Sequence, residues 1–146
     1  MYEFIYYRAA HAMTRTPVTI TGRATLADAE ALFERHDFNG LPVVGDDGRL
    51  AGLLTKLDLL RAFIFTPDSV VPHYDAIMRR SVETVMTHDP RTVALDTPLT
   101  RVLEELVETN CKSLPVVEGD RLVGMIARED VLRALRRAAA GERPGE

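Results

Sequence analysis

The stretch GLLTKLDLLRAF (Gly52–Phe63) decides how this chain is interpreted, because it returns as GMIAREDVLRAL (Gly124–Leu135). Each stretch begins at a glycine, continues through two apolar residues and reaches an aspartate that precedes an apolar helical pattern. Among the differences, Thr55 in the first stretch becomes Ala127 in the second. Two long segments that agree in order and spacing indicate an internal duplication.

The duplication extends well beyond these stretches. MTRTP (Met13–Pro17) matches MTHDP (Met86–Pro90), and LPVV occurs at Leu41–Val44 and again at Leu114–Val117, both with an offset of 73 residues. After the turns GDDG and EGD the offset is 72. The difference of one residue falls in a loop, where insertions are tolerated best.

The first helix of each copy is predicted from apolar residues at helical spacing. In copy one, Thr25 and Asp28 have the spacing of a capping box. In copy two, Thr97 is expected to cap the helix, and Pro98 takes the favoured first helical position. The two apolar stripes consist of Leu26, Ala29, Leu32 and Phe33 in copy one and of Leu99, Val102, Leu103, Leu106 and Val107 in copy two.

The second half of each copy is predicted to be a hairpin followed by a helix. LPVV, a turn rich in Gly and Asp, and LAGLLT or LVGMIA read as two buried strands. Leu57–Phe63 and Glu129–Leu135 then form the closing helices. A short strand after each M-T-x-x-P motif completes the order β-α-β-β-α in each copy. One copy alone would leave apolar surface exposed, so we expect the two copies to pack together.

The linker between the copies contains Pro67 and Pro72, which mark a loop, and residues 75–86 are predicted to form a helix. The expected organisation is an N-terminal extension (1–11), repeat one (12–63), a linker (64–84), repeat two (85–135) and a flexible C-terminal tail (136–146).

Composition narrows the function classes. The chain has 146 residues, 46% of them hydrophobic, and a net charge of −4. This acidic balance lacks the basic footprint of a nucleic-acid-binding protein. Glu3, Arg8 and His11 interrupt the N-terminal apolar residues, which excludes a signal peptide or membrane span there. The single cysteine fits a reducing compartment. We therefore expect a cytoplasmic protein with no nucleic-acid or membrane partner.

The two copies resemble a tandem pair of CBS (cystathionine β-synthase) domains, called a Bateman module. The resemblance rests on M-T-x-x-P, L-P-V-V and G-h-h-[T/A]-x-x-D in this order, where h is apolar. It implies an α+β fold in which two β-α-β-β-α repeats pack about a pseudo-twofold axis, with two clefts between them. It also implies binding of an adenosine nucleotide or S-adenosylmethionine, regulation of another protein, and assembly into a homodimer.

The resemblance implies that each cleft draws on both copies. Asp58 would hold the ribose hydroxyls, and Thr55 would contact ribose or phosphate. The set implied for this cleft, which we expect to bind more strongly, is Thr55, Lys56, Asp58, Thr87, Pro90, Thr92, Cys111, Lys112 and Ser113.

The second cleft departs from the family pattern because Ala127 has no hydroxyl. The neighbouring Arg128 could offer charge-assisted hydrogen bonds to a phosphate instead. The set implied for this weaker cleft is Thr14, Pro17, Thr19, Phe38, Asn39, Gly40, Arg128 and Asp130.

Structural alternatives exist for these residues. T-x-x-D before an apolar helix is also a capping box, so Thr55 and Asp58 could serve folding alone. Lys56, Lys112 and Arg128 could contact phosphate or could be solvated. The aromatic residues Tyr2, Phe4, Tyr6 and Tyr7 could pack on the edge of the module or against a second subunit.

Catalysis has little support in this sequence. There is no P-loop, nucleophile elbow or dinucleotide-binding motif. No sequence feature places a base beside Cys111, for which we expect a packing role. The four histidines lack the spacing of zinc ligands, so no metal is expected. The expected function is a stand-alone sensor of AMP, ADP or ATP, with no required cofactor, that modulates a partner in trans. The alternative is a dimerising interaction scaffold without ligand binding.

Overall fold

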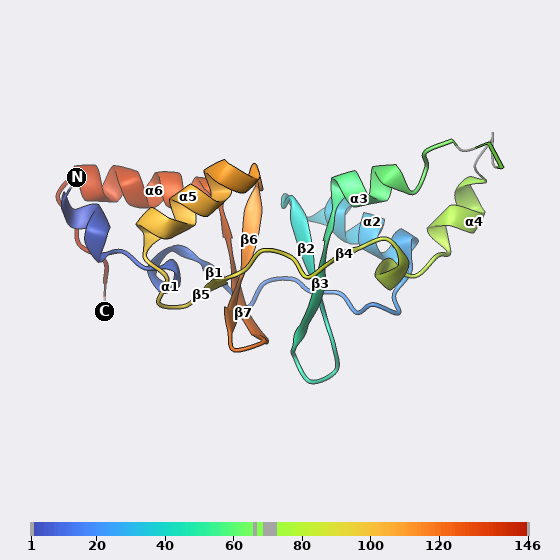
Figure 1. Ribbon diagram of the computed structural model, residues 1–146, viewed down its shortest axis with the longest axis horizontal. Coiled ribbons are helices and arrows are strands. Elements are labelled where there is room, and N and C mark those ends of the chain that lie inside the picture. Colours follow the sequence, from blue (N-terminus) through green and yellow to red (C-terminus); the bar gives the residue numbers. More distant parts are fainter. Residues whose placement is uncertain (1, 66, 69–72, 146) are drawn as a thin grey trace. The chain divides into compact units, whose positions relative to one another are not determined.

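The computed structural model describes residues 2–65, 67–68 and 73–145, and these fall into two compact units. The first unit consists of the residues up to Pro17 together with those from Arg91 onward, and the second is Val18–Pro90. Figure 1 shows helices and strands in both units, which confirms the α+β class with two repeats of a sheet plus helices.

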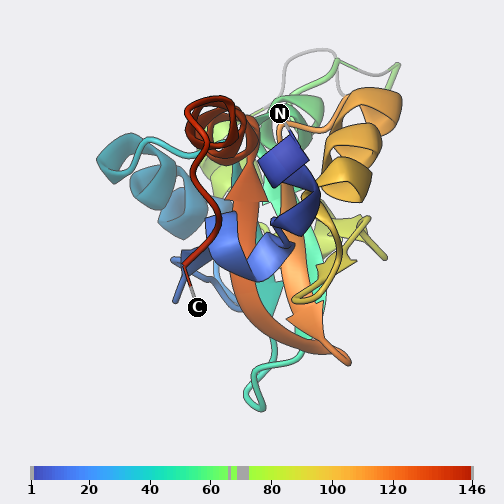
Figure 2. The same cartoon turned by 90° about the vertical axis from the view of Figure 1, so that its left-hand side faces the viewer.

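The first unit contains the chain termini and most of copy two. Its elements are η1 (Tyr2–Tyr6), α1 (Ala9–Ala12), β1 (Thr14–Arg15), β5 (Val93–Ala94), α5 (Leu99–Thr109), β6 (Ser113–Glu118), β7 (Arg121–Ala127) and α6 (Arg128–Ala139), where η denotes a 3-10 helix. Its sheet has the strand order β1-β7-β6-β5, with β5 parallel to β6 and the other pairs antiparallel. Figure 2 shows the N-terminal helices η1 and α1 alongside α6, with which both are in contact.

The second unit contains most of copy one. Its elements are α2 (Leu26–Arg35), β2 (Gly40–Val44), β3 (Leu50–Thr55), α3 (Lys56–Arg61), α4 (Tyr74–Met78), η2 (Val82–Thr84) and β4 (Thr87–His88). Its sheet has the order β2-β3-β4, and both pairs are antiparallel. Ile20 adds a single parallel bridge to Val43, where β5 pairs with β6 in the first unit. Both predicted hairpins are therefore confirmed.

The first strand of each sequence copy pairs with the hairpin of the other copy. Thr14 of β1 lies opposite Met125 of β7, and Thr87 of β4 lies opposite Leu53 of β3. The structural units are therefore offset from the sequence repeats by one strand. A hydrophobic core fills each unit. The core of the second unit includes Met86 of copy two, and that of the first includes Phe4 and Tyr7 of the N-terminal extension, so a single copy does not supply a complete core.

The helical stripes are confirmed except at Val107. The predicted capping box at the start of α2 is present, since the Asp28 N–H donates to Thr25 Oγ1 at 3.1 Å and the Thr25 N–H donates to Asp28 Oδ2 at 3.0 Å. In α5, Leu99, Val102 and Leu106 are buried, whereas Val107 is 71% exposed. The stripe is therefore narrower than the sequence indicated.

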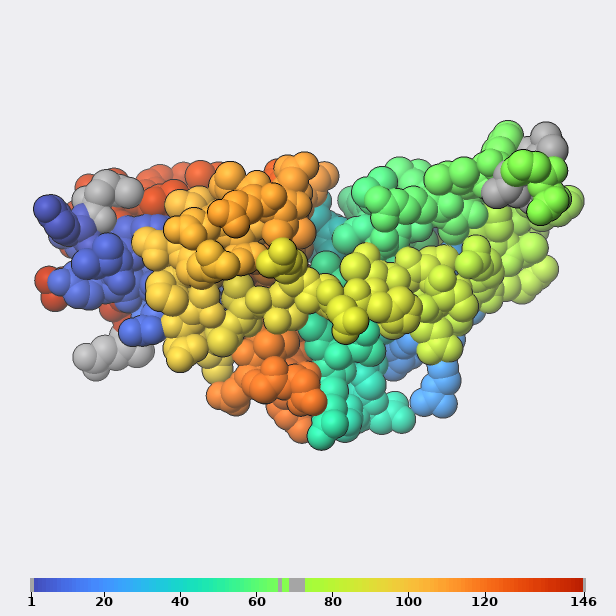
Figure 3. Space-filling model, viewed as in Figure 1, coloured from blue at the N-terminus to red at the C-terminus, as the bar shows by residue number. Residues whose placement is uncertain are grey.

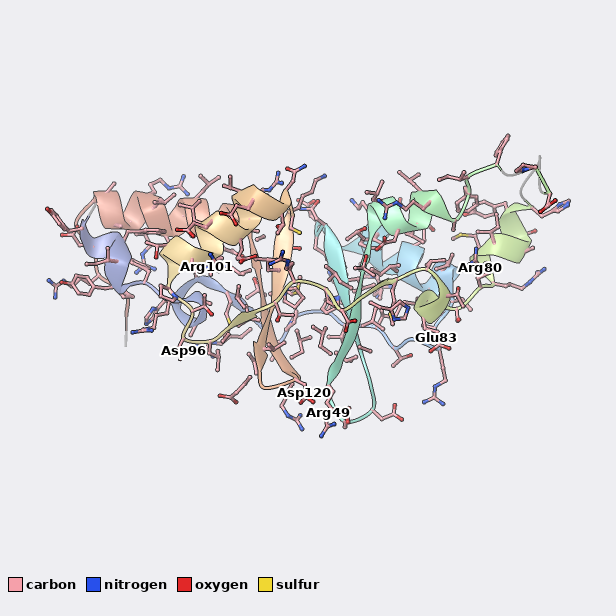
Figure 4. All side chains as sticks on the ribbon, in the orientation of Figure 1. Arg49, Arg80, Glu83, Asp96, Arg101 and Asp120 are labelled. Atoms are coloured by element: carbon pink, nitrogen blue, oxygen red, sulfur yellow. The ribbon has the colours of Figure 1, made fainter. Side chains whose placement is uncertain are left out.

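The same helix α5 buries a carboxylate on its inner side. Glu105 is 8% exposed and accepts a hydrogen bond from Arg101 at 2.6 Å and another from Arg91 at 3.3 Å. Figure 4 labels Arg101 on α5. Two guanidinium groups compensate the desolvation of this buried charge.

The expected cap of α5 by Thr97 is wrong. The Thr97 hydroxyl accepts a hydrogen bond from the Ala94 N–H at 2.8 Å and so closes the turn before the helix. Pro98 stands at the N-cap, and the Leu99 N–H donates to the Tyr7 carbonyl at 2.9 Å. The N-terminal segment thus satisfies a helix end that the side chain was expected to satisfy.

The expected linker helix over residues 75–86 is also wrong in extent. Helix α4 ends at Met78, and η2 follows at Val82–Thr84. In the break between α4 and η2, backbone groups of the linker form hydrogen bonds with copy one: the Leu26 N–H donates to Arg80 O, and the Val82 N–H donates to Ala24 O. Pro67 lies in a turn as predicted, whereas Pro72 lies outside the described residues.

The C-terminal tail is more ordered than expected. Helix α6 continues to Ala139, and Ala138 is fully buried. The Tyr7 hydroxyl donates to the Glu142 carbonyl at 2.9 Å, so the tail and the N-terminal segment hold each other. Tyr7 and Phe4 belong to the core of their own unit, as the first alternative for the aromatic N-terminus stated. No described helix is long and apolar enough to cross a membrane.

Candidate functional site

The start of α3 carries a buried carboxylate within a capping box. The Asp58 N–H donates to Thr55 Oγ1 at 3.2 Å, and the Thr55 N–H donates to Asp58 Oδ2 at 2.9 Å. Asp58 is 4% exposed. The capping interpretation of T-x-x-D is therefore correct here, and it leaves one carboxylate oxygen, Oδ1, outside the cap.

Thr87 brings a hydroxyl to this carboxylate. Because β4 pairs with β3, the Thr87 Oγ1 lies 3.4 Å from Oδ1 and 3.3 Å from Oδ2 of Asp58. The Arg61 guanidinium also lies 3.6 Å from Oδ1. We call Thr55, Lys56, Asp58 and Thr87 the α3 cluster. Sequence reasoning predicted these four but missed Arg61, which the D-x-x-R spacing within a helix could have revealed.

Aromatic side chains lie beside the α3 cluster. The Lys56 ammonium is 5.9 Å from the ring centroid of Phe33, and the Phe33 and Phe38 centroids are 5.4 Å apart. Gly40 lies opposite Thr55 in the β2–β3 ladder. Phe38, Asn39 and Gly40 thus share a unit with Thr55. The family resemblance grouped them with Arg128 and Asp130 of the first unit, and that grouping stays a prediction.

The start of α6 repeats the arrangement without the hydroxyl. The Ala127 N–H donates to Asp130 Oδ2 at 2.8 Å, while Arg133 donates to Asp130 Oδ1 at 3.1 Å. We call Ala127, Arg128 and Asp130 the α6 cluster. Thr14 lies on β1 at the position equivalent to Thr87, but in the described part of the chain its hydroxyl makes no hydrogen bond to Asp130.

Arg128 contacts the loop before β6. Its Nε donates to the Cys111 carbonyl at 3.0 Å, and its Nη2 donates to the carbonyl and the side-chain oxygen of Asn110 at 3.1 and 3.2 Å. Asn110 ends α5 in the left-handed region with φ 56°. The Arg128 backbone N–H also donates to Lys112 O. Sequence reasoning considered phosphate or solvent for this guanidinium and missed the loop.

The remaining predicted residues are distributed over the two units. Cys111, Lys112 and Ser113 lie in the first unit beside Arg128 and Ala127, and Ser113 is buried opposite Ala127. Cys111 packs against the first core, which agrees with its expected role. Thr92 and Pro17 belong to the first unit, and Thr19 and Pro90 to the second. No described group of His, Cys, Asp and Glu has the geometry to hold a metal ion.

Each unit also has an apolar groove between its helices. The groove of the first unit has a volume of about 380 Å³ and lies between α5 and α6, where it includes the exposed Val107 and Leu132. The groove of the second unit, of about 420 Å³, lies among α2, α3 and α4 and includes Lys56 and Leu60. The outer side of α5 forms part of the surface in Figure 3.

A family model of the CBS domain matches residues 9–64 and again residues 82–137. The chain belongs to the CBS-domain family. The two matches confirm the recognition of a CBS-domain pair from its motifs.

Curated relatives include short and long proteins. A CBS domain-containing protein of Dictyostelium discoideum is 30% identical over 126 residues, which cover 84% of this chain and 87% of that protein. The L-aspartate semialdehyde sulfurtransferase of Methanocaldococcus jannaschii is 26% identical over 122 residues, which cover 83% of this chain. The match spans 22% of that enzyme, so this chain corresponds to a minor part of it.

Solved CBS-domain structures have the same fold. CBSX2 in complex with AMP is 26% identical, with a TM-score of 0.77, and the match covers 91% of this chain and 98% of that one. The CBS domain pair of protein MJ0100, in complex with 5′-methylthioadenosine and S-adenosyl-L-methionine, is 25% identical with a TM-score of 0.72. That match covers 88% of this chain and 99% of the other.

Proposed function

We propose that this CBS pair is a sensor that binds an adenosine-containing ligand, AMP, ADP or ATP, and modulates a partner protein in trans. The observation that carries the proposal is the convergence of the Thr55 N–H and the Thr87 hydroxyl on the Asp58 carboxylate, in a cluster built from both sequence copies. A carboxylate accepts the protons of two neighbouring hydroxyls, as a ribose presents them. The similar protein CBSX2 was solved in complex with AMP, which supports an adenosine ligand.

Regulation follows from differential binding in this proposal. A ligand that binds one conformation more tightly than another shifts the population toward the first. The shifted population offers a different surface to the partner protein. The residues of the α3 cluster would hold the ligand more strongly, and those of the α6 cluster more weakly. The other residues implied by the family resemblance complete the two sites in this proposal.

A thermal-shift and calorimetric screen tests the proposal. AMP, ADP, ATP and S-adenosylmethionine are each added to the whole chain. A ligand at about 100 times its Kd should raise the free energy of unfolding by about 2.7 kcal/mol. If no adenosine compound shifts the transition or gives binding heat, the sensor proposal is wrong.

Asp58→Ala and Asp28→Ala form a matched pair that separates ligand contact from helix capping. Each substitution removes one capping box from the second unit, so each should lower the free energy of unfolding by about 0.5–2 kcal/mol. Only Asp58→Ala should also weaken AMP binding, by about tenfold or more, because a charge-assisted contact is lost. Asp130→Ala should weaken it less. Equal affinities for the two members of the pair would assign Asp58 to folding alone.

The exposed apolar side chains favour a second candidate, a dimerising scaffold. Val107 and Leu132 line one groove in the first unit, and Leu132 is 61% exposed. We propose that a second copy of the chain covers this groove. Light scattering of the wild type should then give the mass of a dimer, and Leu132→Glu should give that of a monomer because it places a charge in the apolar contact. A monomeric wild type would remove this candidate.

A further inference from the structure

The two clusters differ in charge at the start of their helices. The first six residues of α3 contain two cations and one carboxylate, whereas those of α6 contain two cations and two carboxylates. The additional carboxylate is Glu129, at the position where α3 has Leu57. A phosphate would therefore meet a net positive charge near α3 and a balanced charge near α6.

The clusters also differ in the donors that are free to bind an anion. Thr55 carries a hydroxyl at the N-cap, and Ala127 carries none. The Lys56 ammonium makes no hydrogen bond or ion pair among the described residues and lies above the Phe33 ring. The Arg128 guanidinium instead gives three hydrogen bonds to Asn110 and Cys111.

These bonds occupy the edge of Arg128 that a phosphate would need. Bidentate binding of an anion uses two N–H groups along one edge of the guanidinium. The Nε and Nη2 edge is already directed at the two carbonyl oxygens of the loop. Both bidentate edges of the guanidinium include Nη2, so a phosphate bound in this way would have to displace at least one of these hydrogen bonds.

Asp130 nevertheless keeps a carboxylate oxygen outside the helix cap. Oδ2 accepts the Ala127 N–H, and the one donor to Oδ1 among the described residues is the exposed Arg133. This oxygen can accept a ribose hydroxyl in the same way as Oδ1 of Asp58. The α6 cluster thus retains a group for the sugar but not a group for the phosphate.

We propose that the α6 cluster recognises the uncharged nucleoside part of an adenosine ligand and leaves its phosphate unbound. The inference rests on the proposed function, because it assigns a ligand class to one of the two proposed sites. The α6 cluster takes adenosine and AMP with similar affinity. Arg128 is a specificity-determining residue in this scheme, since its engagement with the Asn110–Cys111 loop keeps it from the phosphate.

Calorimetric titration of Asp58→Asn with adenosine and with AMP tests the inference, because this substitution leaves the α6 cluster as the responding site. The two affinities should agree within about threefold at both about 50 mM and about 300 mM salt, since no charge contact is made. The matched Asp130→Asn variant should prefer AMP to adenosine by about tenfold at low salt, and the preference should shrink at high salt.

A gain-of-function variant provides the second arm. Ala127→Thr, Arg128→Lys and Glu129→Leu together give α6 the first turn of α3. On the Asp58→Asn background they should raise the preference for AMP over adenosine by about tenfold. If Asp58→Asn lowers the far-ultraviolet circular dichroism, the triple substitution is measured in the wild-type chain, where the weaker of two resolved sites should gain the same preference.

The outcomes separate the inference from the proposed function. An Asp58→Asn chain that prefers AMP by tenfold overturns the inference and leaves the adenosine sensor intact. An Asp58→Asn chain that binds neither compound, while Asp130→Asn binds AMP, also overturns it. If the wild type and both variants bind no adenosine compound, the proposed function fails, and the inference fails with it.

Discussion

Gly52 and Gly124 mark the places where the first strand of one copy reaches the hairpin of the other. A β-carbon at Gly52 would lie 2.6 Å from Sδ of Met86 and 2.8 Å from the carbonyl oxygen of Thr87. A β-carbon at Gly124 would meet Met13 at 2.6 Å in the same way. These glycines are therefore required by close approach of two backbones.

Gly52→Ala should lower the free energy of unfolding by about 1–3 kcal/mol, because the added methyl group forces β4 away from β3. Urea denaturation measures the loss. Gly45→Ala is the control, since its β-carbon would meet only the Asp47 side chain at 3.2 Å in an exposed turn. If Gly52→Ala is no less stable than Gly45→Ala, the strand pairing is not as close as described. Gly124→Ala should repeat the effect in the first unit.

At the residue scale, the sequence was informative where chemistry is local. The capping box of Thr55 and Asp58 was stated as the structural alternative to ligand binding, and their spacing alone determines that pair. The contact of Arg128 with Asn110 and Cys111 was not predictable in the same way, because the partners are 17 and 18 residues away. The hydroxyl of Thr87 reaches Asp58 through strand pairing between copies, and only the family resemblance indicated that contact.

At the element scale, the N-terminal segment is held by a histidine in a defined protonation state. The Arg8 N–H donates to His11 Nδ1 at 2.8 Å, which requires an unprotonated Nδ1. The Arg8 guanidinium donates to the carbonyl of Asp96, which Figure 4 labels. Burial, and then the charge of Arg8, lower the pKa of His11 from 6.5. The uncharged Tyr7 ring packs against His11 in a T-shaped arrangement, with the ring centroids 6.3 Å apart.

A lowered pKa in the folded state means that protonation of His11 opposes folding. The free energy of unfolding should be highest above pH 6.5. It should fall as the pH decreases from 6.5 toward the lowered pKa, because the unfolded chain then binds a proton that the folded chain does not. His11→Asn keeps an acceptor near the position of Nδ1 but does not titrate. Urea denaturation between about pH 5 and pH 8 should therefore give a smaller decrease for His11→Asn than for the wild type. Identical pH profiles would show that His11 does not couple the segment to pH.

Elements with a strong pattern were predictable, whereas those set by tertiary contacts were not. The hairpins followed from apolar runs flanking a turn, and α2 followed from its apolar spacing and capping box. The linker helix failed because Arg80 and Val82 use their backbone groups to bond copy one, which ends α4 at Met78. Val107 satisfied the helical spacing but remains exposed. The spacing shows which residues share a face of the helix, but it does not show how much of that face the rest of the unit covers.

At the scale of the whole molecule, the offset between sequence repeats and structural units makes each repeat depend on the other. The second core includes Met78, Val82 and Met86, all from the second half of the chain. The first core includes Phe4 and Tyr7 from the N-terminus. Cleavage between the exposed residues Ile64 and Phe65 therefore separates each structural unit from some of its core residues and from one strand of its sheet, β1 in the first unit and β4 in the second.

Fragments 1–64 and 65–146 should accordingly fail to unfold cooperatively when each is studied alone. Mixed in equal amounts, they should regain the circular dichroism and a cooperative thermal transition, because β1 then meets β7 and β4 meets β3. The uncut chain gives the reference transition. Gly52→Ala in the first fragment should weaken the reassembly, since it acts on the β3–β4 pair. If fragment 1–64 alone gave a native-like cooperative transition, the contributions of β4 and Val82 to that unit would not be needed for folding. If reassembly is lost with Gly52→Ala but not with Gly45→Ala, the pairing of β3 with β4 is what makes the two repeats depend on each other.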